Sequence, residues 1–266
     1  MTANFTNISL PWGKPAQNQV QVVSPPRVSG TGTGATLSSV LYEFGPFPAY
    51  SLVIGQCLDG LPFMLGLDNP HSGAVLVVGE RDQARKQVLS TMSASACRIN
   101  HPEEVSWSLI SKSPRQYPGL VGSPHCQNVV SPYDRSAGEL VIELASLVEQ
   151  RRFGRERGGM HVLMIDDFQG FAPMLSDYSV YLNLKSLVSK GPACGIWPLL
   201  SARPDDAYSP QGQLLRDFGT YIFEKHDVAH EQNSHASGNQ NSGLDLWPVF
   251  NAIVGGRLIP ISCLPV

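Results

Sequence analysis

The sequence predicts an α/β fold in which helices cover both faces of a mostly parallel sheet. Residues 74–78 and 162–165 are short, continuous apolar runs, which are typical of strands buried on both faces of a parallel sheet. After the first run, small and apolar residues recur at four-residue spacing, as in an amphipathic helix, at Ala84, Val88, Met92 and Ala96. Strand-like and helix-like segments then alternate along the chain, and this alternation favours a parallel sheet.

Composition bounds the classes of function. The 266 residues are 42% hydrophobic and 15% charged, which is enough for the core of one large domain or two small ones. The net charge of −3 provides no overall basic field to attract nucleic acid. No run of about 18 apolar residues predicts a membrane span. The N-terminus lacks the features of a signal peptide and the five cysteines form no C-x-x-C pair, so we expect a cytoplasmic protein with reduced thiols.

The chain divides into two parts. Residues 1–48 are rich in proline, glycine and serine, and we expect a leader or linker there, with residues 49–266 forming one domain. The leader is either a loosely attached tail or a segment whose apolar pieces, Trp12 among them, dock on the body or on a partner. The domain opens with a predicted β-hairpin, because strand-like residues 51–54 and 62–67 flank the turn Asp59-Gly60.

Further elements follow in order. Ser136 and Glu139 have the spacing of a capping box at the start of a helix. A second helix is predicted over residues 178–189, before the stop Gly191-Pro192. The remaining predicted strands cover residues 105–111, 128–130, 195–200 and 217–223, with a closing hairpin at residues 258–260 after Gly255-Gly256.

The segment from Gly73 to Met92 has the outline of a phosphate-binding P-loop. A buried strand feeds a helix through a short loop, which directs backbone N–H groups and the positive helix end at one point. The phosphate-loop motif is Gly-x-x-x-x-Gly-Lys-Ser/Thr, and Gly79 fits its first position. Ala84 occupies the position of the second glycine, Arg85 that of the lysine and Lys86 that of the Ser/Thr hydroxyl. Two interpretations fit: an altered nucleotide site that includes Gln87, or an ordinary strand–turn–helix.

A pair of acids follows the apolar run at residues 162–165. Asp166 and Asp167 stand where a buried strand ends, and α/β sheets place their chemistry at that edge. In a P-loop enzyme the first acid holds Mg²⁺ through water and the second polarises the attacking water. An apolar run followed by two acids is also common in domains without this activity.

Two other groups suggest weaker hypotheses. Histidines at 226, 230 and 235 suggest a metal site, but they lack standard ligand spacing, so a solvent loop is favoured. The arginines between residues 151 and 157 form either a phosphate-binding cluster or a solvated helix end, and the helix dipole favours the second.

The order of these segments resembles the motor domain of FtsK/SpoIIIE-type DNA translocases, within the HerA/FtsK group of P-loop ATPases. The resemblance covers roughly residues 50–266 and implies a RecA-like P-loop NTPase fold. Its motifs lie at residues 60–63, 108–110, 122–125, 144–152, 162–167, 195–204 and 255–261. It implies ATP and Mg²⁺ as ligands, a nucleotide loop with Gly79, Ala84, Arg85, Lys86 and Gln87, and sensor residues Ser201 and Arg203. It also implies assembly into homo- or hetero-oligomers, commonly rings, and DNA as a partner.

The departures from the family pattern fall on one reaction. Residues 84–86 break the phosphate-loop motif, Asp167 replaces the usual catalytic Glu, and Ala202 replaces the sensor Gln. Each change removes a group that acts on the transferred phosphoryl or its metal. Our leading hypothesis is therefore a catalytically impaired domain, an accessory or structural subunit of a DNA-translocation or secretion assembly, which has ATP and Mg²⁺ as its cofactors or has none. The alternatives are a divergent active ATPase, with Asp166 holding Mg²⁺ and Asp167 activating water, and a regulatory module that binds nucleotide without hydrolysis.

Overall fold

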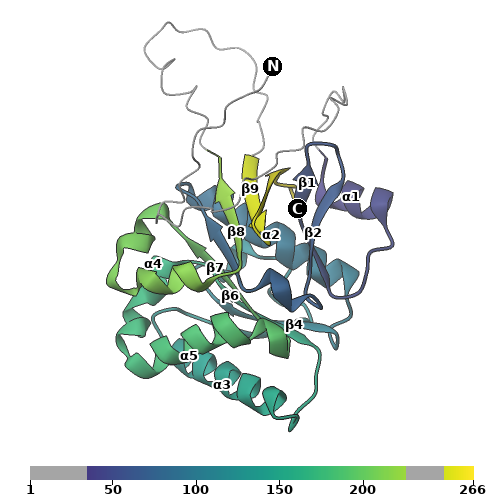
Figure 1. The fold of residues 1–266 in the computed structure, drawn as a ribbon. Helices are drawn as coiled ribbons and strands as arrows, with labels where there is room; N and C mark the ends of the chain where they lie inside the picture. Colours follow the sequence, from purple (N-terminus) through teal and green to yellow (C-terminus); the bar gives the residue numbers. More distant parts are fainter. Residues whose placement is uncertain (1–34, 226–248) are drawn as a thin grey trace, which may run out of the picture.

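The computed structural model describes residues 35–225 and 249–266. They form a ten-stranded, mostly parallel sheet in the order β2-β1-β10-β9-β8-β3-β7-β6-β4-β5 (Figure 1). The six strands from β8 to β5 are parallel to one another, whereas β2, β1, β10 and β9 continue the sheet in antiparallel pairs. The strands are β1 (Ser51–Cys57), β2 (Pro62–Gly66), β3 (Val75–Val78), β4 (Val105–Ile110), β5 (Cys126–Val130), β6 (Met160–Ile165), β7 (Ile196–Ala202), β8 (Thr220–Glu224), β9 (Val249–Val254) and β10 (Arg257–Ser262).

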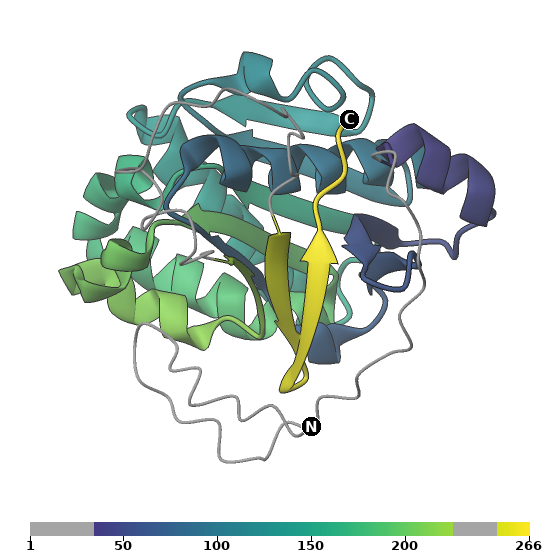
Figure 2. The same cartoon turned by 90° about the horizontal axis from the view of Figure 1, so that it is seen from above.

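Helices cover both faces of this sheet, as predicted. Alternate residues of β3 point to opposite sides, with Leu76 and Val78 in the core under α3 and α5 and Val75 and Val77 in the core under α2. Figure 2 shows α2 crossing one face of the sheet. The α-helices are α1 (Leu37–Phe44), α2 (Asp82–Ile99), α3 (Arg135–Arg152), α4 (Phe168–Phe171) and α5 (Tyr178–Lys190).

The predicted hairpins at both ends of the domain are confirmed. β1 pairs with β2 and β9 pairs with β10, and the two hairpins join where Gln56 of β1 lies opposite Ser262 of β10. The strand expected from residue 217 begins only at Thr220, because the preceding residues form the 3-10 helix Pro210–Asp217.

The expected leader includes an ordered element. Helix α1 packs on the domain through the buried side chains of Leu37 and Val40, and Leu37 N–H donates to the carbonyl oxygen of Pro265 at 2.9 Å. Residues 1–34, with Trp12, lie outside the described part of the chain. Within the described ranges, no helix is both long and apolar enough to cross a membrane.

The predicted capping box of α3 is wrong. The helix begins at Arg135, so Ser136 lies inside the first turn, and Asp134 at the N-cap makes no side-chain cap hydrogen bond. Glu139 instead pairs with Arg135, with 3.0 Å between Oε1 and Nε. The box fails because the helix starts two residues earlier than the Ser-x-x-Glu spacing requires, with Asp134 and not Ser136 at the N-cap.

Candidate functional site

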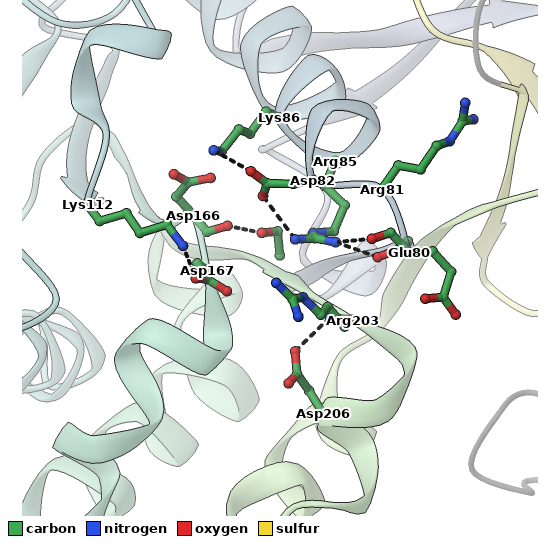
Figure 3. A network of polar contacts seen from close by, with 12 residues as sticks. Glu80, Arg81, Asp82, Arg85, Lys86, Lys112, Asp166, Asp167, Arg203 and Asp206 are labelled. Carbon is green, nitrogen blue, oxygen red and sulfur yellow. Dashed lines mark hydrogen bonds and ion pairs between the residues drawn. The ribbon is translucent and has the colours of Figure 1, made fainter.

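The sheet order brings the ends of four strands to one edge. β7 lies between β3 and β6, and β8 lies on the other side of β3. Gly79 follows β3, Asp166 and Asp167 follow β6, Arg203 follows β7, and Glu224 ends β8. Parallel α/β sheets hold their sites at this carboxyl edge. Figure 3 shows the charged side chains that gather there.

The connection between β3 and α2 is short. Because α2 begins at Asp82, only residues 79–81 lie between strand and helix. Residues 84–86, which correspond to the Gly-Lys-Ser/Thr end of the motif, therefore lie within the helix. The N–H of Arg85 donates to the carbonyl oxygen of Arg81 at 3.2 Å, so this amide is already used by the helix.

The guanidinium of Arg85 is held by the loop itself. Its side chain is 1% exposed, and Nη1 donates to the carbonyl oxygens of Gly79 at 2.5 Å and Glu80 at 3.3 Å. Nη2 donates to Oδ1 of Asp82 at 3.0 Å, while the buried Nε has no hydrogen-bond partner. Two loop carbonyls thus point at a cation, whereas a phosphate-binding loop points N–H groups at an anion.

Asp82 also binds Lys86. The ammonium of Lys86 lies 2.6 Å from Oδ2 of Asp82. Partial burial by itself would raise the pKa of Asp82, but the hydrogen bond and charge of Lys86, with the charges of Arg85 and Lys112, lower it below the ordinary value. Both cations at the lysine and hydroxyl positions of the motif therefore share one carboxylate, which lies in the first turn of α2.

A second carboxylate lies against the loop from β8. Glu224, whose side chain is 4% exposed, pairs with the guanidinium of Arg81 and accepts the Arg81 backbone N–H at 3.3 Å. A Cβ at Gly79 would lie 2.8 Å from Oε2 of Glu224. The contact explains why Gly79 suits this position, and it places a negative charge beside the loop.

Each carboxylate oxygen of Asp166 accepts a hydrogen bond from a protein side chain. Asp166 is buried at the end of β6, and its Oδ2 accepts from the hydroxyl of Ser111 at 2.7 Å. Its Oδ1 accepts from the phenol of Tyr117. Burial and the charge of Asp166 raise the pKa of Tyr117, so the phenol remains a donor. Asp166 therefore connects β6 to the segment after β4.

Asp167 pairs with a cation from the same segment. The ammonium of Lys112 lies 2.9 Å from Oδ2 of Asp167, and this hydrogen bond, with the charges of Asp167 and Asp82, raises the pKa of Lys112. On the other side, Asp206 accepts the backbone N–H of Arg203 at 2.7 Å. Burial and the charge of Asp167 raise the pKa of Asp206 above its ordinary value.

The remaining predicted residues have separate contacts. Gln87 donates its side-chain amide to the carbonyl oxygen of Leu264 at 3.5 Å, and so contacts the C-terminal segment. The hydroxyl of Ser201 donates to the backbone carbonyl of Asp166, which links β7 to β6. The side chain of Arg203 is exposed at the same edge (Figure 3). The three histidines lie outside the described residues, and within the described part no cluster of His, Cys, Asp and Glu side chains has a metal-binding arrangement.

Sequence reasoning missed several of these groups. Lys112 and Glu224 lie at or just after the ends of parallel strands, so the rule that sites form at the carboxyl edge could have found both. Tyr117 lies in an irregular segment, and no pattern connects it with Asp166. The shared partner Asp82 was visible as an acid four residues before Lys86, the spacing at which helical side chains meet.

Comparison with protein-family models and with characterised protein sequences gives no match. Solved structures do resemble this chain. Thermomonospora curvata EccC (ATPases 2 and 3), in complex with a signal sequence peptide, aligns with a TM-score of 0.60 and 17% identity over 82% of this chain and 41% of that one. The cytoplasmic domain of EssC aligns with a TM-score of 0.63 and 12% identity over 87% of this chain and 46% of that one.

The pCW3 conjugation coupling protein TcpA, in its monomer form with ATPγS, aligns with a TM-score of 0.56 and 14% identity over 82% of this chain and 67% of that one. The present chain spans less than half the length of the EccC and EssC chains. At these identities the likeness concerns the fold, and it confirms the expected one: the chain has the P-loop ATPase fold found in EccC, EssC and TcpA.

Proposed function

We propose that this domain is a non-hydrolysing accessory or structural component of a translocation or secretion assembly. The observation that carries the proposal is the position of Arg85, whose buried guanidinium is held by the carbonyl oxygens of the loop that would bind phosphate. A phosphate in that place would meet carbonyl oxygens, and like partial charges repel.

The residues present do not fit a magnesium nucleotide in this arrangement. Glu224 takes the N–H of Arg81, and Asp82 takes the side chains of Arg85 and Lys86. Asp166 receives two protein hydroxyls, and Asp167 receives Lys112. The edge as a whole carries five cationic side chains and six carboxylates: Arg81, Arg85, Lys86, Lys112 and Arg203, with Glu80, Asp82, Asp166, Asp167, Asp206 and Glu224. An edge without excess positive charge is a poor host for a polyanion.

The internal contacts give the edge a different use. Ion pairs and hydrogen bonds join the segments after β3, β4 and β6 to one another or to the last residues of β7 and β8, so the loops are held by protein contacts. A rigid edge of this kind suits a domain retained for its shape and surfaces. The likeness to the type VII secretion ATPase EccC of Thermomonospora curvata and to the conjugation coupling protein TcpA supports placing the domain beside subunits of the same fold.

Isothermal titration of the full chain with ATP and Mg²⁺ tests the proposal. We expect no saturable heat up to millimolar ATP and no magnesium-dependent phosphate release. Binding in the micromolar range would overturn the closed-site interpretation. Asp167→Asn is the control variant for the phosphate-release assay, because it keeps the size of the side chain and removes the carboxylate that Lys112 binds. Any release that persists in this variant does not depend on Asp167.

A divergent ATPase is the second candidate, and the position of Asp166 and Asp167 at the end of β6 favours it. Phosphate release that requires Mg²⁺ and is lost in Asp167→Asn would establish this activity. Nucleotide binding without release would instead establish a regulatory module.

A further inference from the structure

Two half-buried cysteines lie on the same face of the sheet, where helix α2 ends close to the edge strand β5. Cys97 lies in the last turn of α2, and Cys126 is the first residue of β5. Each is a free thiol, and both side chains pack against the core cluster under α2. They come from different elements, and neither contributes to the candidate site at the carboxyl edge.

A β-bulge turns Cys126 toward α2. Ile110 lies opposite Val130 and Trp107 lies opposite Cys126, so β5 contains one residue more than β4 between these two pairs. Val130 packs against the core under α3 and α5. Without the extra residue, side-chain alternation would point Cys126 to that same side, because it lies four residues before Val130. The bulge instead places it with Trp107 in the core under α2.

Hydrogen bonds hold the segment before β5 against the end of α2. Sγ of Cys97 lies 3.8 Å from Oγ of Ser123, and the backbone N–H of Cys126 donates to the carbonyl oxygen of Ser123 at 3.1 Å. The buried ring of His125 donates through Nε2 to the carbonyl oxygen of Asn100, the C-cap of α2, at 3.0 Å. Burial raises the pKa of the Cys97 thiol, and the charge of Cys126 adds to this rise, as expected for neighbouring thiols.

We propose that Cys97 and Cys126 are an oxidation site of this fold, at which a peroxide converts the two thiols into a reversible disulfide that joins α2 to β5. One thiolate attacks an oxygen of hydrogen peroxide, the O–O bond breaks, and the sulfur becomes a sulfenic acid while the leaving hydroxide takes up a proton to form water. The second thiol attacks this sulfur, so that an S–S bond replaces the S–O bond and a second water leaves with the thiol proton. In total the two thiols lose two electrons and two protons, and one peroxide becomes two waters.

The disulfide closes a loop that supports the carboxyl edge. Residues 97–126 include Lys112 and Tyr117, which bind Asp167 and Asp166. A cross-link between the ends of this loop removes conformations from the unfolded chain, so the oxidised protein should be the more stable form.

The rate of oxidation should depend on pH. Burial raises the pKa of both thiols, so only a small fraction of either is thiolate at neutral pH. The thiolate is the attacking form, and we expect the disulfide to form faster as the pH rises from about 7 to about 9. The pair is therefore a slow oxidation site rather than a rapid peroxide sensor.

The test is peptide mapping of the full chain after treatment with hydrogen peroxide, with free thiols alkylated before digestion. Trypsin cleaves after Arg98, Lys112 and Arg115, so Cys97 and Cys126 fall in separate peptides. We expect mass spectrometry to find these two peptides joined by a disulfide in the monomeric chain. Dithiothreitol should separate them.

Serine variants identify the pair and measure its effect. Oxidation should raise the midpoint of thermal unfolding of the wild type by about 5 °C. Cys97→Ser and Cys126→Ser should lose both the linked peptides and this shift. Cys194→Ser is the matched control and should keep both, because Cys194 is also half-buried but packs against the core on the other face of the sheet.

Several results would overturn the inference. Sulfinic or sulfonic acid at Cys97 or Cys126 without linked peptides would show that the two sulfurs do not reach each other. Linkage of either residue to another cysteine, or linkage found only between two chains, would show that the pairing is wrong. The mapping of the wild type requires no variant, so it decides the matter even where a serine variant fails to fold. Neither result bears on nucleotide binding, which the titration with ATP measures separately.

Discussion

The phenol of Tyr117 donates a hydrogen bond to the carboxylate of Asp166, across a sequence separation of 49 residues. The contact joins the segment after β4 to the end of β6 at the candidate site. It gives Asp166 a structural partner in the place where the family resemblance implies a water-bound metal.

Replacing Tyr117 with Phe should therefore destabilise the fold. The change removes a buried donor from a charged acceptor and leaves Ser111 as the other side-chain donor to Asp166. We expect a loss of about 1–3 kcal/mol in the free energy of unfolding, measured by urea denaturation. Tyr133→Phe, at an exposed tyrosine, is the control and should change little. Equal stabilities for the two variants would show that the contact with Asp166 contributes nothing.

Replacing Arg85 with the lysine of the motif should lower the stability of the fold. Arg85 donates to two carbonyl oxygens and to Asp82, and a single ammonium on a shorter, differently shaped side chain cannot reproduce this fork. We expect Arg85→Lys to cost about 1–3 kcal/mol through unsatisfied buried acceptors, read from the shift in thermal unfolding. Arg135→Lys, at an exposed ion pair, should have a free energy of unfolding within about 0.5 kcal/mol of that of the wild type. A stabilised Arg85→Lys would argue that the loop is built for a lysine and an anion.

Alanine substitutions at two neighbouring arginines at the end of α3 should change the stability of the fold by different amounts. Nη1 of Arg151 donates to the carbonyl oxygens of Gly159, Cys194 and Gly195 at 2.9, 3.2 and 3.5 Å, which fixes the helix end to the starts of β6 and β7. Arg152 is exposed and lies 3.7 Å from Glu149. We expect Arg151→Ala to lower the free energy of unfolding by about 2 kcal/mol or more, and Arg152→Ala to lower it by about 0.5 kcal/mol or less. Parallel denaturant titrations of the two variants measure both values. The reverse order would show that these carbonyl contacts do not hold the helix end.

Stability should fall in mild acid because of His161. The ring is buried on β6, with Nδ1 2.8 Å from the hydroxyl of Ser106 and Nε2 3.0 Å from that of Ser108. Burial, and secondarily the charge of Arg151, lower its pKa to about 4 from the ordinary 6.5. The unfolded chain therefore binds a proton between these pH values and the folded chain does not, so stability is full above pH 6.5 and is lost as pH falls toward 4.

The measurement is the free energy of unfolding at several pH values for the wild type and His161→Gln. The wild type should lose up to about 3 kcal/mol more than the variant across this interval. His71→Gln, at an exposed histidine, is the control and should follow the wild type. Parallel curves for the wild type and His161→Gln would show that His161 titrates alike in both states.

Local patterns in the sequence determined most of the fold. The structure confirms three features that depend on residues close in the chain. They are the apolar runs of β3 and β6, the helical spacing from Ala84 to Ala96, and the turn at Asp59-Gly60. Gly79 and the acid pair were also placed correctly at the carboxyl edge, because a parallel sheet brings its strand ends together.

Only the tertiary structure decided which charges meet. Tyr117 approaches Asp166, Lys112 approaches Asp167, and Glu224 approaches Arg81 from segments far apart in the sequence. Such contacts depend on the order of strands and on side-chain direction, which periodicity does not encode. The sequence showed that residues 84–86 depart from the phosphate-loop motif. The fold showed what stands there: a buried arginine bound to a loop carbonyl oxygen and to the carboxylate of Asp82.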